Sequence, residues 1–128
     1  MRKTTIRLIA TAALALALTA CGSDSSPATT SDAPAYKITM QRDQGNPRYI
    51  DVEVKTDERL HDVFDAVIAD LTDEAGYFIY INCATGSTGA EQNRLANGKK
   101  AVGRKGAIVT GLNAGDTEFA PVPGKSCP

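Results

Sequence analysis

The feature that most constrains the fold is an apolar repeat near the middle of the chain. Large apolar side chains recur there at helical spacing, at Leu60, Val63, Phe64, Val67, Ile68 and Leu71. This spacing places them along one face of an α-helix. Thr56 or Asp57 is the expected N-cap, Asp57 and Glu58 suit the first turn, and we expect the helix to end near Leu71. A helix with one apolar face needs a second layer to pack against.

Two alternating segments before this helix predict a β-hairpin. Apolar residues alternate with polar ones over residues 36–41 and again over residues 49–55. A turn-forming cluster, Asp43-Gln44-Gly45-Asn46-Pro47, separates the two segments. Period-two alternation around a short Gly/Pro loop is typical of a hairpin, here residues 36–55.

The chain after the helix is expected to be mostly strand. Residues 77–83 carry apolar side chains on both faces, which predicts a central strand. Beyond it the pattern weakens. We expect a loop at 84–89, a helical turn within 90–97, a turn at Asn97-Gly98, a strand beginning at Ala101-Val102, a strand at 107–110 and a proline-limited edge strand at 118–122.

The order β-β-α-β-β-β predicts the fold class. It indicates a small α+β domain over residues 35–128, in which the hairpin is followed by one amphipathic helix packed on a mostly antiparallel sheet. A β-grasp-like arrangement is compatible with this order.

The start of the chain predicts export. Residues 1–7 are basic without an acidic residue, and residues 8–20 are apolar or small. This is the pattern of a secretory signal peptide, and it is shorter than the ~20 residues that cross a bilayer. It ends in Leu18-Thr19-Ala20-Cys21, which resembles the lipobox of bacterial lipoproteins. The resemblance implies cleavage before Cys21, acylation of Cys21 and anchoring at the outer face of the bacterial cell membrane. The alternative is an ordinary secreted protein in which Cys21 has no role.

The segment after the lipobox is expected to be a flexible tether. Residues 22–34 contain no large apolar side chain and cannot offset their ordering entropy by burial. Their expected root-mean-square span is ~20 Å. The predicted organisation is therefore a signal peptide at 1–20, a lipidated Cys21 with a tether at 21–34, and one domain. The small size and high Ala and Gly content resemble short lipoproteins of high-GC Gram-positive bacteria, which implies no particular function.

The cysteine count predicts a disulfide. If Cys21 is acylated, Cys83 and Cys127 remain as an even pair in an oxidising compartment. Their bridge would close a long loop and stabilise the fold by ~4 kcal/mol in the chain-entropy estimate. The alternatives are a metal site or a reactive thiol, and zinc is disfavoured because the chain has a single histidine and no C-x-x-C motif.

The balance of basic and acidic residues restricts the classes of partner that we expect. Loss of residues 1–20 removes three basic residues and no acidic one, which leaves 11 basic residues against 15 acidic ones. This balance argues against nucleic acid as a partner. Five of the remaining basic residues nevertheless lie within residues 94–105, with no acidic residue between them. The segment contains neither a Walker A loop nor a G-x-G-x-x-G motif.

We therefore predict a candidate binding surface within residues 82–106, for an acidic ligand or a protein partner. Its candidate residues are Asn82, Thr85, Thr88, Asn93, Arg94, Asn97, Lys99, Lys100, Arg104 and Lys105. The alternative is a set of solvated loops whose glycines only make turns.

The sequence offers few candidate catalytic residues. His61 is the single histidine, flanked at helical spacing by Glu58 and Asp65, and no G-x-S-x-G motif is present. We expect no catalytic residue, no cofactor and no metal. The first hypothesis is a non-enzymatic, lipid-anchored extracytoplasmic binding module. The alternatives are a secreted inhibitor or immunity-type protein with a protruding loop near Gly86, and a small envelope enzyme.

Overall fold

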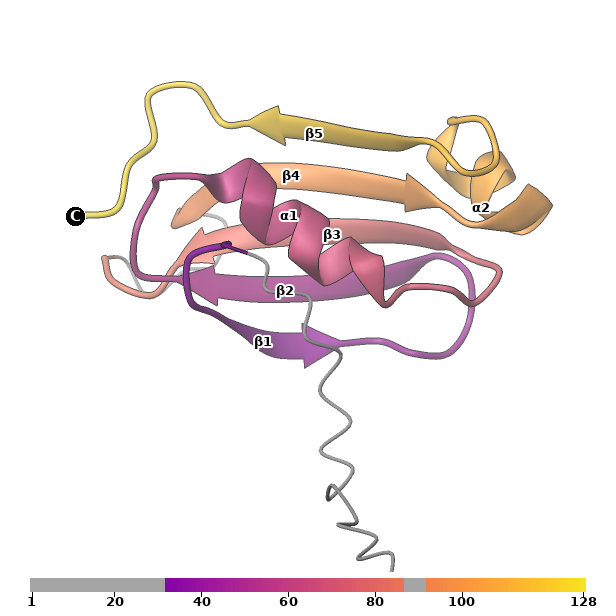
Figure 1. The fold of residues 1–128 in the computed structure, drawn as a ribbon, viewed down its shortest axis with the longest axis horizontal. Helices are drawn as coiled ribbons and strands as arrows, with labels where there is room; N and C mark the ends of the chain where they lie inside the picture. The colour runs from indigo at the N-terminus through magenta and orange to yellow at the C-terminus, as the bar shows by residue number, and fades with distance from the viewer. Residues whose placement is uncertain (1–31, 87–91) are drawn as a thin grey trace, which may run out of the picture.

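The computed structural model describes residues 32–86 and 92–128 (Figure 1). These residues form a five-stranded sheet and two helices. The elements are β1 (Tyr36–Gln41), β2 (Arg48–Val54), α1 (Leu60–Ala69), β3 (Gly76–Cys83), β4 (Arg94–Ala101), α2 (Gly103–Thr110) and β5 (Thr117–Pro121). The predicted signal peptide, the predicted lipobox with Cys21, most of the predicted tether and Thr88 lie outside the described residues.

The sheet confirms the predicted α+β class. The strands lie in chain order, β1-β2-β3-β4-β5, with β2 and β3 parallel and the other three pairs antiparallel. The predicted hairpin is β1 and β2, and the predicted central strand is β3. Because every strand pairs with its neighbours in the sequence, the order is not the interleaved one of a β-grasp sheet.

The core lies between α1 and one face of the sheet. Figure 1 shows α1 crossing in front of the sheet, and its buried residues are Val63, Phe64, Val67 and Ile68. They meet alternate side chains of β2 and β3, namely Ile50, Val52, Val54, Ile79 and Ile81. The apolar helix face, with its period of 3.6 residues, therefore packs against the apolar strand face, with its period of 2.0.

The start of the helix differs from the prediction. Arg59 precedes α1 in a left-handed conformation with φ 53°, and no side chain caps the helix. The Thr56 hydroxyl instead accepts the Glu58 backbone N–H at 3.2 Å, which forms a turn before the helix. Asp57 and Glu58 consequently lie outside the first turn, whose acidic residue is Asp62.

The second half of the chain holds the main corrections. Residues 94–97 are strand, not a helical turn, and Asn97-Gly98 lies within β4, not in a turn. Ala101 ends a strand instead of beginning one. Residues 107–110 belong to α2, so the order is β-β-α-β-β-α-β. Glu118–Ala120 lie in edge strand β5 as predicted, and Val122 follows it.

Close packing explains why α2 forms where strand propensity is high. A Cβ atom at Gly106 would overlap the backbone carbonyl of Ala75, so only glycine lets the helix approach β3 this closely. The Thr110 hydroxyl donates to the Gly106 carbonyl at 2.8 Å, which satisfies a buried polar group within the helix. Tertiary contact thus overrides the β-branched residues at 109 and 110.

The predicted disulfide is present between Cys83 and Cys127, whose Cα atoms are 5.5 Å apart. Cys83 is buried in β3, and Cys127 packs against the same core. The bridge therefore ties the C-terminal segment to the sheet. At the other end, Ala33 of the predicted tether also packs against the core, so ordered contact begins before residue 35.

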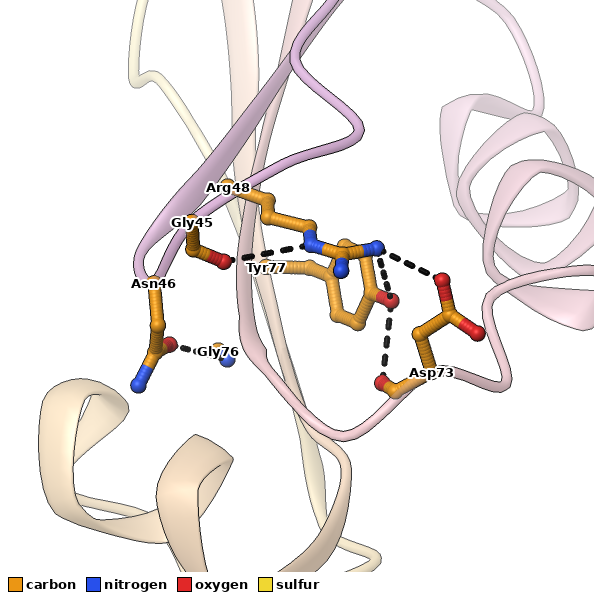
Figure 2. A network of polar contacts seen from close by, with 6 residues as sticks. All are labelled: Gly45, Asn46, Arg48, Asp73, Gly76 and Tyr77. Carbon is orange, nitrogen blue, oxygen red and sulfur yellow. Dashed lines mark hydrogen bonds and ion pairs between the residues drawn. The ribbon is translucent and has the colours of Figure 1, made fainter.

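Polar contacts fix the other end of the sheet (Figure 2). Asn46 in the hairpin turn accepts the Gly76 backbone N–H at 2.8 Å and donates to the Lys105 carbonyl at 3.1 Å. One amide thereby joins the hairpin turn, the start of β3 and helix α2.

Arg48 and Tyr77 form the second part of this network. Arg48 donates to the Asp73 carboxylate at 2.8 Å, and the Tyr77 hydroxyl donates to the Asp73 carbonyl at 3.0 Å (Figure 2). The hydrogen bond to Asp73 raises the pKa of Arg48. Burial is the main cause that raises the pKa of Tyr77. Both groups keep their ordinary charge at neutral pH, so we assign the network to holding loops together.

We expect Asn46→Ala to lower the free energy of unfolding by about 1–2 kcal/mol, because the buried Gly76 N–H loses its acceptor. Asn46→Asp keeps an acceptor and loses only the donor to Lys105, so its loss should be smaller. Urea unfolding of the three chains measures the difference. Equal stability of Asn46→Ala and the parent chain would contradict this role.

Candidate functional site on the open face of the sheet

The face of the sheet opposite α1 is here called the open face. Its side chains come from the three central strands: Tyr49, Asp51 and Glu53 in β2, Phe78, Tyr80 and Asn82 in β3, and Arg94, Asn97 and Lys99 in β4. They alternate in β2 and β3, whereas a register shift in β4 lets Arg94 share the face with Asn97. All are half-buried except Asn82, which is 5% exposed. Within the described residues, α2 reaches this face at the end where β3 begins, since a Cβ at Gly76 would meet Val109.

Aromatic rings form the centre of the open face. The Tyr49 ring stacks with Phe78 at 5.6 Å and with Tyr80 at 6.3 Å between centroids. The Arg94 guanidinium lies 4.0 Å from the Tyr80 centroid, and that of Arg42 lies 5.6 Å from the Tyr49 centroid. Such contacts stabilise by about 0.5–1.5 kcal/mol each, so the rings are held in one arrangement.

Arg94 is fixed on this face by two side-chain amides. Its Nε donates to Asn82 Oδ1 at 2.8 Å, and its Nη1 donates to Asn97 Oδ1 at 2.8 Å. The planar guanidinium is thus oriented by two hydrogen bonds and one ring. The amides are neutral, so they do not cancel the positive charge of Arg94.

Two shallow hollows flank the rings. One, of about 200 Å³, is mostly apolar and is lined by Phe78, Tyr80, Asn97, Gly98, Lys99, Glu118 and Ala120. At its rim Lys99 forms a 3.1 Å ion pair with Glu118. The other, of about 210 Å³, is polar and is lined by Thr39, Asp51, Glu53, Asn82, Cys83, Ala84 and Asn93. Both are smaller than the cavities of ~300–1,000 Å³ that enclose small-molecule ligands.

The structure gathers only part of the surface predicted from the sequence. Asn82, Arg94, Asn97 and Lys99 share the open face. Lys100 lies on the other face of β4, where its Nζ donates to the Ile68 carbonyl at 2.7 Å, near the C-terminal end of α1.

The remaining predicted residues lie at opposite ends of the sheet. Arg104 and Lys105 are exposed on α2, and Lys105 is 3.9 Å from Glu74. Thr85 and Asn93 lie near the disulfide, where the Thr85 hydroxyl donates to the Pro128 carbonyl at 3.3 Å. Residues 82–106 are therefore not one basic surface, because acidic residues from distant segments pair with Lys99 and Lys105.

His61 has ordinary partners. Its Nδ1 lies 3.2 Å from the Asp65 carboxylate, and its ring meets Phe119 edge-on at 4.9 Å. His61, Asp62 and Asp65 each offer one potential metal-ligand atom, and these three atoms lie within 4.8 Å of one another. Asp62 is already paired with Arg59 at 2.6 Å, so the cluster is explained by ion pairs along α1.

Comparisons with known proteins add no family. No protein-family model matches the chain, and no curated protein or solved structure is significantly similar to it. Over residues 32–86 and 92–128, neither helix has the length and apolar character needed to cross a membrane.

Proposed function

We propose that the chain is a non-enzymatic, lipid-anchored extracytoplasmic interaction module that binds a protein partner through the open face. The observation that carries the proposal is the cluster of stacked rings, Tyr49, Phe78 and Tyr80, on a sheet face that no described helix covers along most of its length. A second layer would normally cover such a face.

The composition and shape of the open face favour a protein as the partner. Aromatic residues and arginine are enriched at protein interfaces and contribute most of their binding energy. The side chains come from paired strands, which hold them more rigidly than loops would. The shallow hollows give a small ligand little enclosure, whereas a flat face suits a second folded surface.

The anchor belongs to the same proposal. Acyl chains on Cys21 would hold the domain at the outer face of the membrane, and the tether would let the open face approach membrane-bound neighbours. The inhibitor hypothesis depends on the loop near Gly86, and residues 87–91 of that loop lie outside the described residues. No observation specifically favours it or an enzymatic activity.

Cys21→Ser tests the anchor. We expect this variant to incorporate no fatty acid and to leave the membrane fraction, because the acylated thiol is absent. Metabolic labelling with a fatty-acid analogue followed by fractionation measures both. Cys127→Ser is the matched control and should still be labelled. Unchanged labelling of Cys21→Ser would contradict lipidation at this residue.

The open face is tested by photo-crosslinking in intact cells. A photoreactive residue replaces Ala120, beside the rings, or Asp65 on α1 as the control position. We expect discrete protein adducts from position 120 and not from position 65. Tyr80→Ala should reduce the adducts at least tenfold, whereas Tyr36→Ala, on β1, should not. The proposal would be overturned if position 120 gave no adducts, or if Tyr80→Ala left their amount unchanged.

A further inference from the structure

We infer that the partner of the open face is a second copy of the chain, packed face to face about a two-fold axis parallel to β3. The inference rests on the proposed function, because it names the occupant of the same surface. What carries it is the order of charges across the sheet.

The strand registers arrange the open face into three rows across the sheet, of which the first begins just after β1 and the third ends at β4. The first row reads Arg42, Tyr49, Phe78, Lys99, Glu118. The second reads Met40, Asp51, Tyr80, Asn97, Ala120. The third reads Lys37, Glu53, Asn82, Arg94. In every row the β3 residue is uncharged and lies in the middle of the sheet.

A two-fold axis along β3 reverses each row and lays it over itself. In the first row this places Arg42 of one copy over Glu118 of the other. In the third row it places Glu53 over Arg94. Each pair occurs twice in a symmetric dimer. No two like charges of these rows come to lie over one another, so the face is electrostatically complementary to itself.

The remaining positions are also compatible with a second copy. Phe78 and Tyr80 lie at the axis, so rings pack against rings in the centre of the interface, where binding energy concentrates. Met40 lies over Ala120 of the other copy, which pairs a large apolar side chain with a small one. Asp51 lies over Asn97, whose amide is a hydrogen-bond donor.

An axis perpendicular to the strands gives a poorer match. It lays each strand over its own copy and reverses the order of the rows. Asp51 then lies over Asp51, and Arg94 lies over Lys99. These like-charge contacts oppose association, so the charges select the axis parallel to β3.

The size of the face predicts the strength of the dimer. Five strands spaced ~4.8 Å apart and about six residues long give a face of roughly 24 by 20 Å. This is at the low end of specific interfaces, so we expect a weak dimer in dilute solution. Anchoring both copies to one membrane raises their effective concentration and favours the dimer.

The test exchanges charges in the full-length chain. Two copies with different tags are expressed together, solubilised in detergent and crosslinked. One tag is then used for recovery, and the amount of the other copy recovered with it is measured. We expect parent copies to recover each other. Glu53→Arg in both copies, or Arg94→Glu in both, should lower recovery at least tenfold. A Glu53→Arg copy with an Arg94→Glu copy should restore it, because each introduced charge then meets its opposite.

A second pair guards against loss of folding, since Arg94 supports the buried Asn82. Arg42→Glu and Glu118→Arg change exposed residues and should show the same loss and mutual rescue. Glu58→Arg, before α1, is the charge-matched control and should have no effect. Loss without rescue in both pairs would overturn the second copy as partner.

Failure of this inference is distinguishable from failure of the proposed function. If parent copies do not recover each other while position 120 still crosslinks to another protein through Tyr80, the second copy is excluded and the interaction module stands. If neither recovery nor adducts occur, both are overturned.

Discussion

Cys127→Ser is expected to lower the free energy of unfolding by about 3–4 kcal/mol. The bridge joins residues 44 positions apart, and the chain-entropy estimate for such a loop is ~4 kcal/mol. The bond also holds the segment after β5 against the core through the partly buried Cys127. The bridge restricts the unfolded chain, so its loss lowers the stability of the whole domain. Urea unfolding of the variant and the parent chain measures the change.

The matched control is the parent chain with and without reductant. Reduction should bring its unfolding midpoint close to that of Cys127→Ser, and reductant should leave the variant unchanged. A loss well under 1 kcal/mol, or a parent chain indifferent to reduction, would show that the bridge adds little to the stability of this fold.

Gly98→Val is expected to lower the free energy of unfolding by about 3 kcal/mol. A Cβ atom at this position in β4 would overlap the ring of Phe64, which is 1% exposed and cannot move away from the sheet without opening the core. Overpacking of this kind costs about 1–3 kcal/mol, and valine adds two methyl groups to the clash. Thermal and urea unfolding both measure the loss.

A double-variant cycle assigns this loss to the contact with Phe64. Gly98→Ala combined with Phe64→Leu should lose about 1 kcal/mol less than the sum of the two single losses, because the smaller side chain relieves the overlap. Strict additivity would contradict direct contact between the two positions. The result also bears on the fold, since Gly98 is what brings α1 onto β4.

The parts of the fold that could be predicted are those with a long, regular pattern. The apolar repeat from Leu60 to Leu71 predicts α1, and the alternation before it predicts β1 and β2, because each element has one buried face. The cysteine pair follows from counting after Cys21 is set aside. These inferences need only local periodicity and the chemistry of an oxidising compartment.

The errors fall where tertiary contacts override local preference. Asn97-Gly98 has the sequence of a turn, but Phe64 packs against Gly98 and two neighbouring strands hold the backbone extended. Residues 107–110 have strand propensity, but Gly106 lets them pack as a helix against Ala75. Neither contact can be predicted from a window of sequence, because the partners lie about 30 residues away.

The candidate site shows the same division. The basic residues at 94–105 are evident in the sequence, whereas their pairing with Glu74 and Glu118 is a product of folding. The aromatic centre is not part of the surface predicted from the sequence, although the sequence carries a signal for it. Tyr49, Phe78 and Tyr80 occupy the phase of their strands opposite to Ile50, Ile79 and Ile81. Aromatic residues in the exposed phase of adjacent strands would have indicated this face.

The most direct test of the central claim, that the open face is covered by a partner in the cell, is thiol accessibility. Cysteines replace Met40 and Ala120 on the open face, or Glu58 and Ile108 as exposed controls, one at a time in the full-length chain. A membrane-impermeant maleimide then labels intact cells and detergent-diluted protein. We predict labelling at positions 40 and 120 to be several-fold slower in cells than after dilution, with no difference at 58 and 108. Equal rates at all four positions in both conditions would contradict the account.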